Sequence, residues 1–174
     1  GDSIIVSAGT YTGTINFSGK NMILVAPEGP SSTILDGDGA GPVVTIANGE
    51  TAAAVLDGFT ITGGSASSGG GLYIYSNTSP TLKNLIITEN TASTYGGGLY
   101  VYINSSPTLT NTKITNNSAN YGGGLYLGWD GDMSLSNVEI TGNTATYYGS
   151  AIYHYNGGQL SVINSTIAGN SGGT

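Results

Sequence analysis

Three aspartates, Asp36, Asp38 and Asp57, are the residues of this chain that could supply acid and base chemistry. Hydrolysis of a glycosidic bond needs two carboxyl groups about 5 to 10 Å apart, one on each side of the bond. Asp36 and Asp38 belong to the run Asp-Gly-Asp-Gly, which is also typical of a solvated turn. The three carboxylates are therefore candidate catalytic acids, but for Asp36 and Asp38 a solvated turn is the favoured interpretation.

Asp130 and Asp132 form a second closely spaced pair, and Ca²⁺ binds carboxylates together with turn carbonyls. Neither aspartate pair supplies the five or six spaced oxygens of an established calcium loop. The sequence therefore predicts no cofactor, with calcium at Asp130 and Asp132 as the alternative. His154 has no acid or nucleophile at a matching position, so a half-buried residue near the end of the chain is expected rather than a base.

Aromatic residues recur at regular intervals from Tyr73 onward. The candidate ligand-binding residues are Tyr73, Tyr75, Tyr100, Tyr102, Tyr126, Trp129, Tyr153 and Tyr155. A strip of outward rings can stack on sugar rings or on another protein. Stacked rings that only stabilise one face of a sheet are the competing interpretation.

A second regular surface carries hydroxyl groups. Its residues are Thr81, Thr108, Thr110, Ser134 and Ser136. Regular hydroxyl arrays recur in ice-binding solenoids, which makes ice binding a further hypothesis. Lys83 and Asp57 interrupt the array.

These side chains recur because the chain itself repeats. Three apolar series share a spacing of 26 or 27 residues: Ile61, Ile87, Ile114, Ile140 and Ile167; Leu72, Leu99, Leu125 and Ile152; and Leu82, Leu109, Leu135 and Val162. One period shared by several series is typical of a solenoid, in which every repeat packs only on its neighbours.

The gaps between the three series predict three short strands in each coil. Ten residues always separate Leu72 and its equivalents from Leu82 and its equivalents, and five more lead to the next isoleucine. The gap from an isoleucine to the next leucine is 11 or 12 residues, so we expect the extra residue in one variable turn. Alternation along each strand points the three series inward and the tyrosines, threonines and serines outward.

Asparagines and glycines recur with the same period and predict the corners between strands. The two asparagine rows are Asn84, Asn111, Asn137 and Asn164, and Asn90, Asn117, Asn143 and Asn170. Asparagine tolerates left-handed backbone angles and hydrogen-bonds neighbouring backbone groups. The Gly-Gly-Gly triplets at 69–71, 96–98 and 122–124 indicate corners where backbone chirality or crowding excludes a side chain.

Composition limits the partners of the protein. The 174 residues carry a net charge of −7 and only three basic residues, Lys20, Lys83 and Lys113. Nucleic-acid binding and polybasic contact with a membrane both need clustered Lys or Arg, so neither is expected. No apolar run reaches the roughly 18 residues of a membrane span. The absence of cysteine fits an extracellular or cell-surface protein without a disulfide framework.

One continuous domain is expected, with capping strands and opening coils in residues 1–54 and regular coils in residues 55–174. The next inward residue would fall near position 179, so the sequence predicts no C-terminal cap. Either the chain is a fragment of a longer protein, or its bare end stacks head-to-tail on another copy and builds a fibre.

Ile-x-x-Asn paired with Gly-Gly-Gly-Leu-Tyr resembles the repeats of bacterial right-handed parallel β-helix proteins. It is especially similar to the polymorphic outer-membrane protein type, over residues 55–171. Residues 2–11 and 33–37 resemble the first coil of pectin-lyase-like domains. The resemblance implies an all-β fold of about six coils, and the superfamily includes lyases, hydrolases, esterases and adhesin stalks.

Enzymes of this superfamily that act on acidic polysaccharides generally combine carboxylates with Arg or Lys. This chain has no Arg. The sequence therefore favours a non-catalytic structural or adhesive module outside the cell, which contacts glycans or protein subunits through the tyrosines. A carbohydrate-active enzyme and an ice-binding protein are the alternatives.

Overall fold

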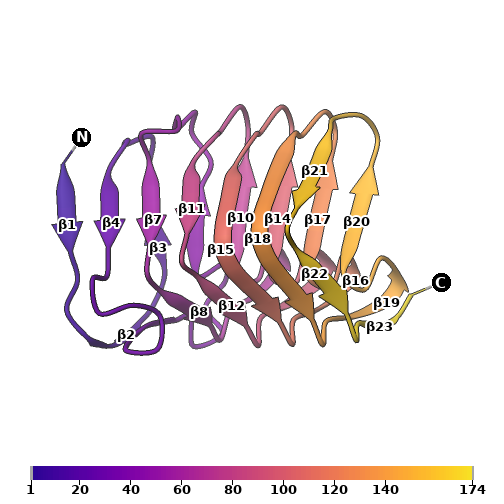
Figure 1. Cartoon of the computed structure of the whole chain (residues 1–174), viewed down its shortest axis with the longest axis horizontal. Helices are drawn as coiled ribbons and strands as arrows, with labels where there is room; N and C mark the ends of the chain where they lie inside the picture. Colours follow the sequence, from indigo (N-terminus) through magenta and orange to yellow (C-terminus); the bar gives the residue numbers. More distant parts are fainter. Residues whose placement is uncertain (1, 174) are drawn as a thin grey trace.

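A computed structural model describes residues 2–173, which form a rod of stacked coils with parallel strands throughout (Figure 1). The first and last coils lie at opposite ends of the rod. Within residues 2–173 there is no helix, and hence none long and apolar enough to cross a membrane. The predicted all-β parallel β-helix is confirmed.

The strands belong to three sheets. The twelve-stranded sheet consists of β1 (Ser3–Ile5), β2 (Gly9–Thr12), β4 (Ile23–Val25), β5 (Thr33–Asp36), β7 (Val55–Asp57), β8 (Thr60–Thr62), β11 (Thr81–Lys83), β12 (Ile86–Thr88), β15 (Thr108–Thr115), β18 (Met133–Thr141), β21 (Leu160–Ile163) and β22 (Thr166–Ala168). The six-stranded sheet consists of β3 (Ile15–Asn16), β6 (Val44–Ile46), β10 (Leu72–Tyr75), β14 (Leu99–Tyr102), β17 (Leu125–Gly128) and β20 (Ile152–Tyr155). The five-stranded sheet consists of β9 (Ser65–Ser68), β13 (Thr91–Tyr95), β16 (Ser118–Tyr121), β19 (Thr144–Tyr148) and β23 (Ser171–Gly172).

The three apolar series form three columns inside the rod, as the period predicts. Ile87 pairs with Ile61 on one side and Ile114 on the other, and both the Leu72 and Leu82 series pair in the same way. The isoleucines are fully buried except in the last coil, where Ile167 is partly exposed. Leu35 pairs with Ile61, so the columns continue into the first third of the chain. The three series thus supply ten of the 26 residues of the buried core, stacked coil on coil.

The twelve-stranded sheet bends at the first asparagine row. In β15 and β18 one strand runs through the bend, whereas β11 and β12 are separate. Asn84, Asn111 and Asn137 have φ values of 53°, 49° and 56°, in the left-handed region expected for asparagine at a corner. Their exposed side-chain amides form a chain of hydrogen bonds, for example from Asn137 Nδ2 to Asn111 Oδ1 at 2.8 Å.

The second asparagine row is buried at Asn90, Asn117 and Asn143, and none of its members adopts left-handed angles. The residues before it do so instead, for example Glu89 with φ 57° and Asn116 with φ 56°. The Asn117 Nδ2 group donates to the Ile87 carbonyl of the preceding coil at 2.9 Å. The expected backbone role is therefore wrong for this row, whereas the expected hydrogen bonds to neighbouring coils are confirmed.

The segment predicted as a variable turn is instead the five-stranded sheet. Ala92 pairs with Ala66, and Tyr95 pairs with Ser68, with a shift of register between the two pairs. The same shift separates Ala119 from the tyrosine pair on the next coil. A bulge in this sheet therefore absorbs the residue that makes some repeats 27 long instead of 26. Spacing located the insertion, but it could not distinguish a bulged strand from a turn.

The glycine triplets form the corner between the five-stranded and six-stranded sheets. Gly96 has φ 63°, a backbone angle that L side chains rarely adopt. A Cβ added at Gly97 would overlap with the carbonyl oxygens of Ser118 and Gly123. Chirality and crowding therefore exclude side chains at successive positions, as the sequence predicts, where the backbone turns from one sheet into the next.

The first coil is shorter than the others, since Ser3 pairs with Ile23 only 20 residues later. Strands β4 and β5 pair with β7 and β8, so the sheet runs without a break past residue 54. Ile4 at one end is 47% exposed, and Val162 at the other is 42% exposed. Gly1 and Thr174, at the outer limits of the two predicted segments, lie outside the described residues.

Candidate binding groove

Strands of the six-stranded sheet project two aromatic columns outward. The first contains Tyr73, Tyr100, Tyr126 and Tyr153, which occupy one register on β10, β14, β17 and β20. The second contains Tyr75, Tyr102, Gly128 and Tyr155, so a glycine interrupts it. The predicted outward direction of these tyrosines follows from strand alternation, because Leu72, Ile74 and their equivalents fill the interior.

A third aromatic column, which the sequence analysis did not include, lies on the five-stranded sheet. Tyr95 pairs with Tyr121, and Tyr121 pairs with Tyr148. Each of these tyrosines directly precedes a corner glycine. The corner brings Tyr95 to within 4.7 Å of Tyr126, measured between ring centroids. The repeated Tyr-Gly pair was the signal that could have identified this column.

The rings do not form the flat strip that the sequence predicted. Tyr100 stacks on Tyr73 and on Tyr126, with centroid distances of 5.2 Å and 5.3 Å and interplanar angles of 21° and 24°. Tyr100 is only 7% exposed and Tyr126 only 4%. Ring faces within a column are thus occupied by neighbouring rings, and the two central tyrosines form a floor instead of a contact surface.

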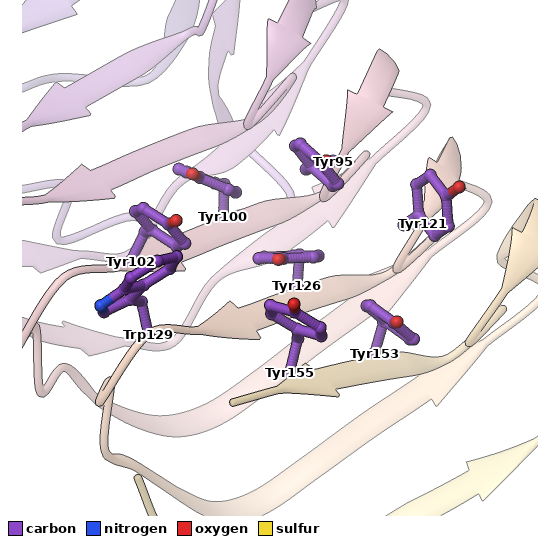
Figure 2. A pocket seen from close by; sticks show the side chains of 8 residues that line it. All are labelled: Tyr95, Tyr100, Tyr102, Tyr121, Tyr126, Trp129, Tyr153 and Tyr155. Atoms are coloured by element: carbon purple, nitrogen blue, oxygen red, sulfur yellow. The ribbon is translucent and has the colours of Figure 1, made fainter. Parts of the chain in front are cut away.

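Around this floor the remaining rings enclose an open groove of about 430 Å³ (Figure 2). Its lining consists of Tyr95, Tyr100, Tyr102, Tyr121, Tyr126, Trp129, Tyr153 and Tyr155. A Cβ at Gly128 would lie 2.7 Å from the ring of Tyr126, so this glycine makes room for the floor. The volume falls within the roughly 300 to 1,000 Å³ of small-molecule sites.

Trp129 at the rim of the groove has an unusual backbone. Its φ is 51°, a conformation that bulky residues rarely adopt. Hydrogen bonds hold the backbone there, because the Trp129 amide donates to the Tyr155 carbonyl at 3.1 Å and its own carbonyl accepts from Asn104 at 3.2 Å. The indole is 51% exposed and meets Tyr102 edge-on, at 6.0 Å and 66°. Neighbouring coils thus fix one largely free aromatic ring beside the groove.

The two buried phenols of the groove floor, Tyr100 and Tyr126, remain neutral over the physiological range. Burial raises the pKa of Tyr100 and of Tyr126 above the ordinary value of 10.0, and the nearby tyrosines raise each pKa further. Burial also raises the pKa of Tyr102. A neutral phenol both donates and accepts hydrogen bonds, so the lining offers polar contacts without charge.

The hydroxyl residues lie on the twelve-stranded sheet, away from the groove lining. Thr81 pairs with Thr108 and Thr108 with Ser134 in one column, while Thr110 pairs with Ser136 in another. Lys83 pairs with Thr110 on one side and Asp57 on the other, so the array is interrupted where the sequence indicated.

The candidate catalytic aspartates occupy different positions on the rod. Asp57 forms an ion pair with Lys83 at 3.2 Å and accepts a hydrogen bond from Asn84 at 2.7 Å. Asp36 lies in another column, where it pairs with Thr62, and its Oδ1 accepts the Asp38 amide at 3.0 Å. Asp36 and Asp38 thus form the expected turn, and Asp57 is engaged in an ion pair.

Asp130 and Asp132 lie on the turn that follows the groove rim. Asp132 Oδ1 accepts the Gln159 amide at 2.7 Å, and Asp130 has φ 59°. Across residues 2–173 no three His, Cys, Asp or Glu side chains gather in a way that would hold a metal. His154 occupies the inward register, opposite Leu127, yet it is exposed in the last coil and contacts the Gly157 carbonyl at 2.8 Å.

Comparisons with known proteins agree with this architecture. A family described as right handed beta helix region matches residues 31–174. No curated protein and no solved structure gives a significant match. The family match covers most of the chain, and the parallel coils with their apolar columns have the architecture that its description names. The chain therefore belongs to the right-handed β-helix family.

Proposed function

We propose that this protein is a non-catalytic structural or adhesive β-helix module, outside the cell or on its surface, that binds a glycan through the aromatic groove. The observation that supports this proposal is the groove itself, with eight aromatic side chains around 430 Å³. Aromatic rings contribute large apolar contacts, while their hydroxyl and indole N–H groups orient a polar ligand. Sugars present the matching combination of apolar C–H faces and hydroxyl groups.

The packing of the rings favours binding by a prepared surface. Tyr100 and Tyr126 are held on several sides by other tyrosines, so little side-chain entropy remains to be lost in a complex. Trp129 and Tyr155 are the most exposed members of the lining, at 51% and 47%. We therefore expect the ligand to contact these two rings, and the buried tyrosines to support the groove.

A glycan array with the intact protein tests the proposal, followed by calorimetry on the best ligand. Replacement of one contacting ring should cost about 1 kcal/mol, so Tyr155→Ala should weaken binding about fivefold. Tyr11→Ala is the matched control, because Tyr11 is similarly exposed, at 43%, and lies at the other end of the rod. Equal affinities for the two variants, or no glycan bound by the wild type, would refute the proposal.

Contact with another protein through the same groove, and head-to-tail stacking of copies into a fibre, are further proposals about its partners. Stacking would cover the exposed inward side chains Ile4 and Val162 at the two ends of the described rod. Light scattering over a range of concentrations distinguishes the two modes. Growth beyond a dimer supports stacking, since a groove contact closes on itself or on one partner.

The hydroxyl columns support ice binding as an alternative. Thr108 is exposed and lies in register with Thr81 and Ser134, which gives an array with the spacing of the coils. Thermal hysteresis that is lost in Thr108→Leu and retained in Tyr155→Ala would assign activity to this face. For the enzymatic alternative, turnover of pectate or alginate that is abolished by Asp57→Asn would assign catalysis to this carboxylate.

A further inference from the structure

The groove has no charged side chain in its lining. Two of the three lysines, Lys83 and Lys113, form ion pairs with Asp57 and Glu139 on the twelve-stranded sheet. The third lysine, Lys20, lies between β3 of the six-stranded sheet and β4 of the twelve-stranded sheet. The protein as a whole has a net charge of −7. An anionic ligand would therefore be repelled and would find no cation in the groove.

Several ring pairs around the floor are steeply inclined to each other. Tyr95 and Tyr126 are inclined at 49°, and Tyr102 and Trp129 at 66°. Tyr121 and Tyr153 are inclined at 45°. Rings at these angles are not stacked face to face, so parts of their faces remain open toward the groove (Figure 2). Each aromatic face carries the negative end of the ring quadrupole.

We infer that this groove binds a quaternary ammonium group, of the trimethylammonium type. A cation over an aromatic face is attracted by the ring quadrupole, and the attraction grows when water is excluded. A quaternary ammonium group has no N–H, so it needs no carboxylate acceptor, and the groove provides none. The inference goes beyond the proposed glycan binding, because it holds whether the group is free or attached to a sugar chain.

The negative charge of the protein acts in the same direction. Asp130 directly follows Trp129 in the chain, and Asp132 lies two residues further on. Burial raises the pKa of Tyr126, so its phenol stays neutral, and the lining meets a cation with ring faces and hydroxyl dipoles only. A neutral ligand of the same shape gains the apolar contact, but neither the cation–π attraction nor the attraction to the acidic protein.

Choline and 3,3-dimethylbutanol form the matched pair of probes, because they have nearly the same shape and differ in charge. Binding to the intact protein can be followed through Trp129, the single tryptophan of the chain, and independently by ligand-observed NMR. We expect choline to bind at least about tenfold more tightly, which corresponds to ~1.4 kcal/mol. Added salt should weaken choline binding and leave 3,3-dimethylbutanol unaffected.

Variants locate the site. Trp129→Leu should weaken choline binding about fivefold or more by NMR, and Trp129→Tyr should retain most of the affinity because a ring face remains. Tyr147→Leu is the matched control, since Tyr147 is also 51% exposed but does not line the groove. Circular dichroism confirms that each variant retains its sheet structure.

Equal affinities for choline and 3,3-dimethylbutanol, or no choline binding, would overturn the inference. So would choline binding that Trp129→Leu leaves unchanged. This result can be separated from the proposed function. If a neutral glycan binds at Tyr155 and choline does not bind, glycan recognition stands and the inference about a quaternary ammonium group fails. If choline binds and no glycan on the array does, the inference stands and the proposed glycan binding fails.

Discussion

The buried asparagine row allows a stability prediction with an internal control. In Asn117→Ala the side chain loses its hydrogen bonds to the Ile87 carbonyl at 2.9 Å and the Thr115 carbonyl at 3.1 Å. Its Nδ2 group also donates to Asn143 Oδ1 at 3.0 Å, and its Oδ1 accepts both the backbone amide and Nδ2 of Asn90. Asn117 is 1% exposed, so water cannot replace these bonds.

The magnitude follows from the hydrogen atoms involved. Two belong to the Asn117 amide, which divides them among three acceptors, and two come from Asn90. At about 1 kcal/mol for each of the four, the substitution should lower the free energy of unfolding by about 4 kcal/mol. The loss of stability is not smaller than this, because the substitution leaves the former partners of Asn117 buried without a hydrogen bond.

Asn111→Ala on the same coil is the control. Asn111 is exposed, so water can replace its amide bonds to Asn84 and Asn137, and the main cost is that of placing alanine at φ 49°. That cost is about 1 to 2 kcal/mol. Urea denaturation followed by circular dichroism compares the two variants. If Asn117→Ala costs no more than Asn111→Ala, the buried amides do not stabilise the corner as we argue.

Two further predictions concern strain and pH. Ile103 has φ 51° in the register where Asn156 has φ 59°. Since asparagine tolerates this backbone angle better than isoleucine, Ile103→Asn should raise the free energy of unfolding by about 1 kcal/mol in thermal or urea denaturation. A loss of stability would show that the backbone at Ile103 is not strained. Burial raises the pKa of Tyr100 and Tyr126, so the folded state retains protons that the unfolded state releases near pH 10. The stability that these two phenols contribute is therefore fully present below about pH 10. Above that pH the free energy of unfolding should fall by up to about 1.4 kcal/mol per pH unit for each tyrosine. Urea denaturation at about pH 9 and about pH 11, with phenolate absorbance recorded in parallel, checks the slope, and early titration of every tyrosine would refute it.

The repeat period by itself determined the fold and the direction of most side chains. Because coils of nearly equal length stack, residues 26 or 27 apart must lie in one column, and strand alternation then divides inward from outward. The positions of Ile87, Leu72 and Leu82 in the core follow from this rule alone. The hydroxyl columns and the ion pair of Lys83 with Asp57 lie where it places them.

Only the tertiary structure decided the shape of the aromatic surface. The period tells which residues stack on successive coils along the rod. The groove depends instead on the angle between the two sheets that meet at the corner glycines. That angle brings Tyr95 and Tyr121 over the first column, buries Tyr100 and Tyr126, and converts an expected strip into a groove. The period carries no information about this angle, because it is set by how the backbone turns at Gly96 and its equivalents and by the packing of the rings themselves.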